Sequence, residues 1–405
     1  MAIAESSTAD NDLPAGEASE QEAPPPIVER KRTRLRRFAF RVLMVFAPVH
    51  LYVGWRLLPD LPVDLPLQVA GGVLLAVSAL LIPFGTLSRL FLSEQGLVDK
   101  LVWAGAFTMG LFSSVLVLTL FRDIAMIFPD VRAWSAETAL GVLGVSLLVT
   151  LIGFVNARRV ARVVDVEIPI AGLPSALEGF TIAQITDIHV GSTIKGDYVK
   201  GIVERVNAID ADAIAITGDV VDGKVAELNA DTAPLADLKA RYGTFLVSGN
   251  HEYYSGWDEW LAEFRRLALK PLPNSHEVIS HNGAEIVIAG VNDYSAGRFD
   301  EAQASDPAKA LDGSPEDAPK ILLAHQPRSA DAADEAGFDL QLSGHTHGGQ
   351  FWPWNHFVRM QQPYTAGLDR HGKLWVYTSR GTGYWGPPKR FGAPSEITRI
   401  RLTKA

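Results

Sequence analysis

The sequence predicts a multi-span helical membrane anchor followed by an α/β (α+β) domain with layered β-sheets. Long uncharged segments occupy the N-terminal part of the chain. From about residue 163 onward, short apolar runs rich in β-branched residues alternate with helical stretches, which is typical of sheets covered by helices. The 405 residues include no cysteine, so a disulfide framework and a thiolate zinc site are excluded. Any metal must therefore be held by oxygen atoms and imidazoles.

The first 37 residues form two compositional segments. Residues 1–29 are rich in Ala, Glu, Ser and Pro and show no periodic apolar pattern, so we expect a disordered acidic tail. The basic run at 30–37 comes directly before an apolar segment, which favours a role beside the membrane surface.

Four apolar segments follow, and we expect a four-helix transmembrane region over residues 38–157. Residues 65–88, 101–121 and 138–157 carry no charge over 24, 21 and 20 positions, respectively. Each matches the roughly 20 residues that cross a bilayer as a helix. The first segment, from about residue 42 to 58, is a weaker candidate because it contains a proline, a histidine and an arginine.

The distribution of Lys and Arg predicts the orientation in the membrane. The loops on the side of the N-terminus and the C-terminal domain carry 12 such residues, against 3 on the opposite side. This asymmetry predicts a multi-pass protein of the cell membrane with a cytoplasmic C-terminal domain and the lipid bilayer as a partner. The lack of charges deep in the last three segments favours an anchor over a transporter. A net charge of −9 argues against a nucleic-acid partner.

The C-terminal region, 163–405, contains eight strand-like runs: 180–186, 213–217, 243–248, 285–290, 320–324, 338–343, 373–379 and 396–402. Helix-like segments lie between several of them, for example at 197–209 and 258–267. In such domains, ligand sites form beyond the carboxyl ends of the strands.

Polar blocks follow five of these runs at their carboxyl ends. They are Asp187-Ile188-His189, Gly218-Asp219, Gly249-Asn250-His251-Glu252, His325 and Gly344-His345-Thr346-His347. Seven side chains in them suit a divalent metal: Asp187, His189, Asp219, Asn250, His325, His345 and His347. Seven ligands are too many for one tetrahedral ion, so we expect two. The two carboxylates would leave a net positive charge for a phosphoryl group.

This ordered series, D-x-H, G-D, G-N-H-E, H and G-H-T-H, resembles the calcineurin-like metallophosphoesterase superfamily over roughly residues 180–402. The segments GNHEYYSG, LSGHTHGGQ and SRGTGYWGPPKRF resemble its bacterial, membrane-anchored branch. The resemblance implies a four-layer α/β/β/α sandwich. It also implies hydrolysis of a phosphoester by a hydroxide that bridges two divalent ions, which could be Mn, Fe, Zn or Mg.

The resemblance also implies a role for each matching residue. Asp187, His189, Asp219 and His347 would hold one ion, and Asn250, His325 and His345 the other, with Asp219 shared by both. His251 would not be a ligand and would lie beside the leaving group as a general acid or a transition-state stabiliser. Glu252 and Asp222 would support the ligands from behind.

Departures from sister families narrow the choice. Serine/threonine protein phosphatases carry an arginine after the second aspartate block, where this chain has GDVVDGK. Purple acid phosphatases need a tyrosine ligand at the position of Asp222. Cyclic-nucleotide phosphodiesterases share all five blocks, so they remain an alternative.

The sequence thus favours a membrane-anchored phosphoesterase acting on a phosphodiester or a pyrophosphate bond, with an amphiphilic, lipid-linked or nucleotide-linked substrate as the candidate. The aromatic segments 351–354 and 385–388, with Tyr253 and Tyr254, would form either core packing or an apolar rim beside the metals. The other hypotheses are a soluble-substrate phosphodiesterase and a non-catalytic membrane receptor or scaffold with a metal-binding domain.

Overall fold

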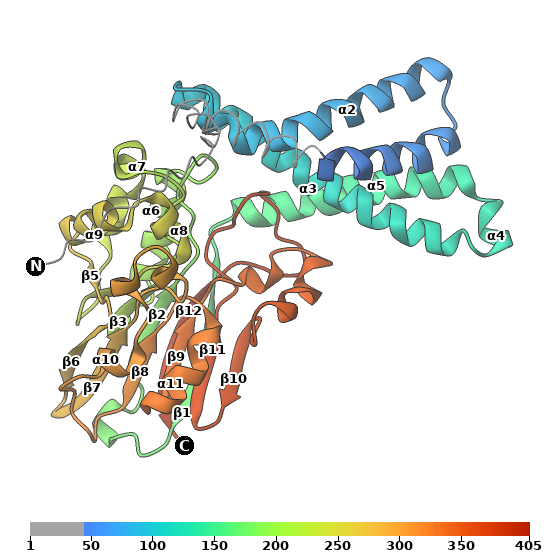
Figure 1. Ribbon diagram of the computed structural model, residues 1–405. Helices are drawn as coiled ribbons and strands as arrows, with labels where there is room; N and C mark the ends of the chain where they lie inside the picture. The colour runs from blue at the N-terminus through green and yellow to red at the C-terminus, as the bar shows by residue number, and fades with distance from the viewer. Residues whose placement is uncertain (1–43) are drawn as a thin grey trace, which may run out of the picture.

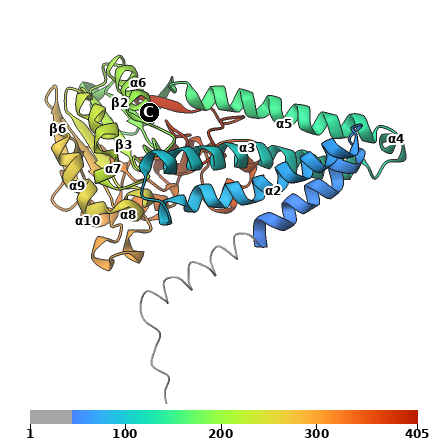
Figure 2. The same cartoon turned by 90° about the horizontal axis from the view of Figure 1, so that it is seen from above.

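The computed structural model describes residues 44–405, apart from the side chain of Leu90 (Figure 1). The predicted acidic tail and basic run, residues 1–37, lie outside these residues. The helical region comprises a helical stretch at 44–57 and the helices α2 (Leu65–Leu87), α3 (Gln95–Ala125), α4 (Pro129–Arg132) and α5 (Ser135–Arg158). Figure 2 shows α2, α3 and α5 side by side, extending away from the rest of the chain.

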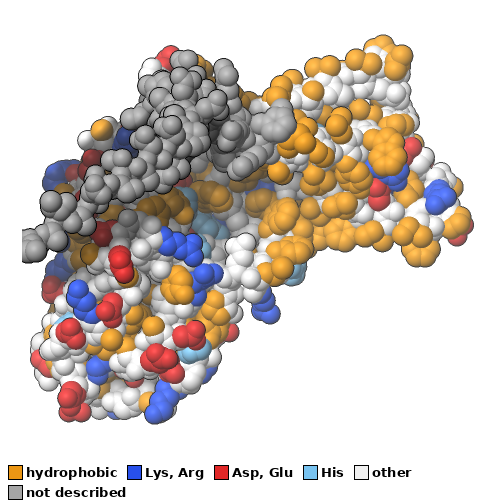
Figure 3. Space-filling view, viewed as in Figure 1, with side chains coloured by type: hydrophobic (Ala, Val, Ile, Leu, Met, Phe, Trp, Pro, Cys, Tyr) orange, Lys and Arg blue, Asp and Glu red, His pale blue; other side chains and the backbone are white. Residues whose placement is uncertain are grey.

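Within residues 44–405, three helices are long and apolar enough to cross a membrane: α2, α3 and α5. They coincide with the three uncharged segments of the sequence. Part of the first predicted segment lies outside the described residues, so its crossing of the bilayer stays a prediction. Apolar side chains cover much of the surface of these helices (Figure 3).

Small residues let α2 and α3 approach each other closely. A Cβ atom on Gly85 of α2 would lie 2.7 Å from the carbonyl oxygen of Leu101 on α3. Gly105 meets α2 in the same way, with its Cβ position 2.9 Å from the carbonyl oxygen of Leu81. Membrane helices commonly pack through such small residues because lipid supplies no hydrophobic force between them.

The C-terminal region contains two mixed β-sheets in the described part of the chain. The first has the strand order β1-β12-β2-β3-β4-β5, and the second β10-β11-β9-β8-β7-β6. The strands of the first sheet are β1 (Arg162–Ile170), β12 (Glu396–Lys404), β2 (Thr181–Ile185), β3 (Ala213–Thr217), β4 (Thr244–Val247) and β5 (Lys270–Pro271). Those of the second are β10 (Gly367–His371), β11 (Leu374–Thr378), β9 (Leu340–Ser343), β8 (Lys320–Leu323), β7 (Ala284–Gly290) and β6 (Ser275–His281).

Helices cover the outer face of each sheet, which completes the predicted four-layer α/β/β/α sandwich. On the first sheet they are α6 (Gly196–Asn207), α7 (Val225–Thr232) and α9 (Trp257–Arg266); on the second, α10 (Pro307–Ala310) and α11 (Ala330–Ala336). Strand β3 shows why the layers form. Ala213 and Ala215 pack between the sheets, whereas Ile214 and Ile216 pack under the helices, because successive side chains point to opposite faces.

All eight predicted strands are present, and the four that the sequence did not indicate are β1, β5, β6 and β10. These four are the two edge strands of each sheet. Edge strands are partly exposed and carry charged residues, so they lack the continuous apolar runs that mark buried strands.

A loop of the C-terminal region, residues 385–391, is inserted between the apolar helices. The amide N–H of Arg390 donates to the carbonyl oxygen of Gly153 on α5 at 2.8 Å. The Lys389 ammonium donates to the carbonyl oxygen of Gly110 (2.8 Å) and to the Ser114 hydroxyl (2.5 Å) on α3, and to the Thr150 hydroxyl (3.1 Å) on α5. The helices are therefore packed against the sandwich at the end where its polar blocks gather.

Candidate metal centre

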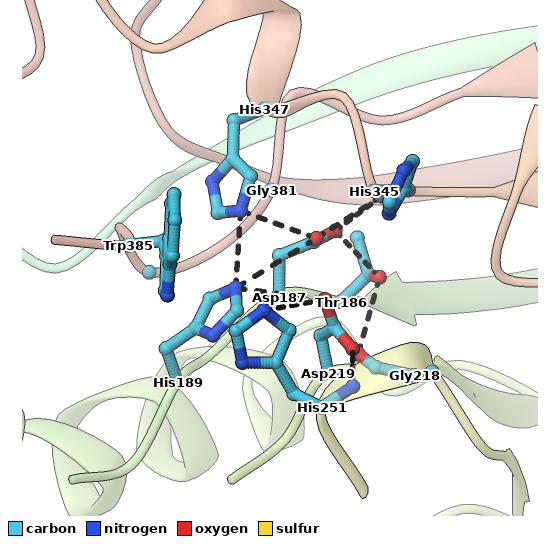
Figure 4. A network of polar contacts seen from close by, with 12 residues as sticks. Thr186, Asp187, His189, Gly218, Asp219, His251, His345, His347, Gly381 and Trp385 are labelled. Carbon is cyan, nitrogen blue, oxygen red and sulfur yellow. Dashed lines mark hydrogen bonds and ion pairs between the residues drawn. The ribbon is translucent and has the colours of Figure 1, made fainter. Parts of the chain in front are cut away.

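The five polar blocks meet where carboxyl ends of strands from both sheets come together. Asp187 follows β2, Asp219 follows β3 and Asn250 opens the short helix α8 (Asn250–Ser255) after β4. His325 and His345 follow β8 and β9 of the second sheet. Figure 4 shows Asp187, Asp219 and His345 pointing into one space, together with His189 and His347.

One set of predicted ligands contains Asp187, His189 and His347. The Nε2 atoms of the two imidazoles are 3.0 Å apart, and His347 Nε2 lies 3.3 Å from Asp187 Oδ1. His189 Nε2 is also 3.8 Å from Asp219 Oδ2. Asp219 therefore lies beside this set, as expected for a carboxylate that two ions share.

A second set contains Asp219, His325 and His345. His325 Nε2 is 3.1 Å from Asp219 Oδ2 and 3.2 Å from His345 Nδ1. The side-chain oxygen of Asn250 is buried and has no hydrogen-bond partner within the described residues. A buried amide oxygen without a donor is costly unless a cation completes its environment.

These residues fit the predicted pair of divalent cations. Asp187 and Asp219 are 0% and 2% exposed, so their charges need compensation inside the protein. Burial raises the pKa of Asp187. For Asp219, burial acts in the same direction, but the neighbouring imidazoles of His325 and His251 outweigh it and hold the pKa well below its usual range. The two buried carboxylates therefore favour positive charge in this pocket.

The tautomers of two imidazoles also suit metal ligation. His325 Nδ1 lies 2.8 Å from the carbonyl oxygen of Thr217, and His189 Nδ1 lies 2.9 Å from Asp222 Oδ1. An acceptor at Nδ1 keeps the proton there and leaves the Nε2 lone pair free. At His347 the neighbour of Nδ1 is a donor rather than an acceptor, namely the Arg390 guanidinium at 3.1 Å.

His251 lies beside the two sets rather than within them. Its Nδ1 is 2.6 Å from Asp222 Oδ1, and its Nε2 is 4.0 Å from Asp219 Oδ2. Its side chain is 17% exposed. Burial lowers the pKa of His251, but the carboxylates of Asp219 and Asp222 outweigh this and raise it to about 9. These carboxylates therefore favour the protonated form of His251 in the site without metal ions.

Glu252 holds the loop that carries Asp219. Its carboxylate accepts hydrogen bonds from the backbone N–H groups of Asp219 (3.0 Å), Val220 (2.7 Å), Val221 (3.1 Å) and Gly249 (2.6 Å). Asp222 likewise joins His189 and His251 through one oxygen atom. These contacts agree with the supporting roles that the resemblance implied for both carboxylates.

The backbone of the site is strained in a way that the sequence did not indicate. Five of the predicted ligands have φ between 51° and 70°, a left-handed conformation that non-glycine residues seldom adopt: Asp187, His189, Asp219, His345 and His347. Each such residue costs about 1–3 kcal/mol, and such strain is concentrated at functional sites. Two glycines of the blocks are needed for another reason, because any side chain at these positions would collide with a carboxylate. A Cβ on Gly249 would lie 2.1 Å from Asp219 Oδ1, and one on Gly344 would lie 2.2 Å from Asp187 Oδ2.

Two arginines near the site were not singled out from the sequence. Arg390 is 1% exposed, and its guanidinium donates to the carbonyl oxygen of His347 at 2.8 Å. Arg89, from the turn after α2, donates to the carbonyl oxygen of Asp222 at 2.5 Å and to the Ser192 hydroxyl at 2.7 Å. The segment SRGTGYWGPPKRF was the available signal for Arg390. For Arg89 the sequence suggested a membrane-flanking charge only.

The two aromatic segments lie in different environments. The Trp385 ring is 5.6 Å from the His251 ring, so this segment forms part of the rim of the site (Figure 4). The ring of Tyr254, three residues after His251, has its centroid 5.5 Å from that of the imidazole. Trp352 and Trp354 instead contact α3, where Trp352 stacks on Phe121 and Trp354 donates to the Ser113 hydroxyl.

Comparisons with known proteins agree with this fold and with these blocks. The family model described as calcineurin-like phosphoesterase matches residues 180–349. An uncharacterized metallophosphoesterase of Campylobacter jejuni is 37% identical over 268 residues, which cover 66% of this chain and 69% of that protein. The chain therefore belongs to the calcineurin-like phosphoesterase family.

A transmembrane protein with metallophosphoesterase domain from Bos taurus is 38% identical over 285 residues, which cover 68% of this chain and 64% of the bovine protein. Relatives of this chain are thus found outside bacteria. Among solved structures, a 5'-nucleotidase precursor from Thermus thermophilus aligns with 56% of this chain and 54% of its own, at 14% identity and a TM-score of 0.35. The apolar helices α2, α3 and α5, together with the bovine relative, support a membrane protein.

Proposed function

We propose that this protein is a membrane-anchored, binuclear-metal phosphoesterase that hydrolyses a phosphodiester or a pyrophosphate bond. The observation that carries the proposal is the convergence of two buried carboxylates and four imidazoles in two sets, together with the buried, unpartnered amide oxygen of Asn250. His251 lies beside these sets. Two divalent cations bound there would neutralise the phosphoryl oxygens and lower the pKa of an attacking water.

Each of the candidate site residues would have a defined role. Asp187, His189, Asp219 and His347 would hold one ion, and Asn250, His325 and His345 the other, with Asp219 common to both. His251 would donate a proton from its imidazole to the leaving oxygen. Asp222 keeps that imidazole oriented and charged through its 2.6 Å contact. The protonated His251 and the complete ligand set favour an enzyme over a receptor or scaffold that binds metal without turnover.

We further propose that the sandwich faces the cytoplasm. Arg89 lies at the domain end of α2, and Arg158 lies at the domain end of α5, where it donates to the carbonyl oxygen of Thr193. Basic residues at this end match the positive-inside rule. We also propose a cell-membrane location, with the site close to the lipid headgroups.

The test is metal-dependent hydrolysis of bis(p-nitrophenyl) phosphate by the full-length protein, with p-nitrophenyl phosphate as the monoester comparison. We expect diester cleavage that requires an added divalent cation and that disappears in Asp219→Asn. This carboxylate lies beside both ligand sets, so its loss should remove both ions. Cleavage that persists in Asp219→Asn would contradict the assignment, and no cleavage with any metal would favour the binding protein.

A further inference from the structure

A cavity of about 880 Å³ lies between the apolar helices and the candidate metal centre. At one end it is lined by His251, Asp222 and Trp385. At the other end it is lined by α2 and α3, through residues that include Ile82, Thr86 and Val102. Its size is within the range of ligand sites, about 300–1,000 Å³.

The two ends differ in chemistry. The α2 and α3 side is built from the uncharged segments that are long enough to span a bilayer, and Pro83, Ala106 and Met109 continue its apolar lining. Basic side chains of Arg89 and Lys224 line the cavity between this side and His251. Within residues 44–405, no carboxylate is close enough to either side chain to form an ion pair, although Glu227 also lines the cavity.

The shape and charge of the cavity therefore match one kind of molecule. An anionic phosphoryl group would lie between the basic side chains and the metal ligands, while an apolar chain would continue along α2 and α3. A soluble nucleotide would use the polar end only and would leave the apolar walls wet, at a cost in free energy.

We propose that this cavity, the α2/α3 groove, binds the hydrocarbon chain of a membrane phospholipid whose phosphoester is the substrate. The proposal rests on the proposed phosphoesterase function and specifies its substrate class. It makes α2 and α3 part of the substrate-binding site as well as an anchor. The hydrocarbon chain could then stay against α2 and α3 while the phosphoester lies at the polar end beside His251.

The test compares two phosphodiesters with the same leaving group, p-nitrophenyl hexadecyl phosphate and p-nitrophenyl methyl phosphate, using the full-length protein in phosphatidylcholine nanodiscs. We expect kcat/KM for the hexadecyl ester to be at least roughly tenfold higher, since burial of two methylene groups already corresponds to that factor. Thr86→Trp and Val102→Trp fill the groove from α2 and α3 and should bring the ratio of the two values close to one. Val77→Trp places the same indole at an exposed position of α2 that does not line the groove, and it should leave the ratio unchanged.

Equal kcat/KM values for the two esters, or a ratio that neither groove variant alters, would overturn the proposal while leaving the phosphoesterase function intact. A protein that cleaves neither ester with any metal would refute the proposed function instead. In that case photolabelling with hexadecyl phosphate carrying a mid-chain diazirine tests independently whether the groove binds a hydrocarbon chain. Labelling of residues 82–109 that Thr86→Trp abolishes would support the site, and labelling elsewhere would refute it.

Discussion

Replacement of Asp222 by asparagine tests how the site holds its histidines. Asp222 Oδ1 is 2.9 Å from His189 Nδ1 and 2.6 Å from His251 Nδ1, so a single carboxylate orients a metal ligand and the proposed proton donor. Asparagine has the same shape and can still accept a hydrogen bond, but it carries no charge.

The size of the effect follows from these two contacts. A hydrogen bond to a charged group contributes about 1.5–3 kcal/mol, against about 1 kcal/mol for a neutral one. Asp222→Asn should therefore lose roughly 1 kcal/mol per contact and roughly 2 kcal/mol in total, which corresponds to about 30-fold. The free energy lost at the His189 contact should appear as weaker metal affinity, and that lost at the His251 contact as a lower kcat at saturating metal.

The pH profile of the activity distinguishes the effect at His251 from the effect at His189. His251 can donate a proton only while it is protonated, so activity should fall as the pH rises through its pKa. The neighbouring carboxylates raise this pKa to about 9 in the site without metal ions, and bound divalent cations would lower it. Asp222→Asn removes part of the charge that raises this pKa. The alkaline limb of kcat should therefore move to lower pH in the variant.

The assay is kcat and kcat/KM for bis(p-nitrophenyl) phosphate across the neutral and alkaline range, with a metal titration at each pH. Asp312→Asn, at an exposed position, is the matched control and should behave as wild type. An Asp222→Asn protein with wild-type kcat and an unshifted alkaline limb would refute the role of this carboxylate.

Three other changes have defined outcomes. Removal of bound metal with a chelator should abolish diester hydrolysis and lower Tm, because Asp187 and Asp219 would remain buried without their countercharge. An unchanged Tm would argue against a buried metal pair. Gly249→Ala should lower kcat/KM at least about tenfold with the fold retained by circular dichroism, because its Cβ would lie 2.1 Å from Asp219 Oδ1. Lys389→Met should lower the free energy of unfolding by about 2–4 kcal/mol, since it leaves the carbonyl of Gly110 and the Ser114 hydroxyl without their donor. Wild-type stability of this variant in a denaturation series would show that the contact does not anchor the loop.

The interior of the fold could be predicted from the sequence because burial on both faces produces a local signal. The central strand β3, AIAIT, is apolar at every position but the last, and its two faces enter two different cores. Edge strands such as β1, RVVDVEIPI, are half exposed, so their charged residues hide the pattern. The uncharged stretches of α2, α3 and α5 were equally clear, since the bilayer selects for length and apolarity.

That these residues hold metal ions stays a prediction, but the clustering of carboxylates and imidazoles was predictable, because side chains directly after buried strands share one edge of the sandwich. Their conformation was not. The left-handed backbone at Asp187, His189 and Asp219 depends on contacts such as those of Glu252 with the 219–221 backbone, which form only after the strands have assembled.

By itself the sequence determined the apolar helices, the alternating strands and the candidate ligands that follow them, since each depends on the composition of a short segment. Only the tertiary structure decided that Lys389 lies between α3 and α5, and that the α2/α3 groove ends at His251. Lys389 meets its partners on Gly110 and Thr150 across 279 and 239 positions of the chain. No periodicity or local propensity encodes a contact over that distance, because it arises from how separately formed elements pack together.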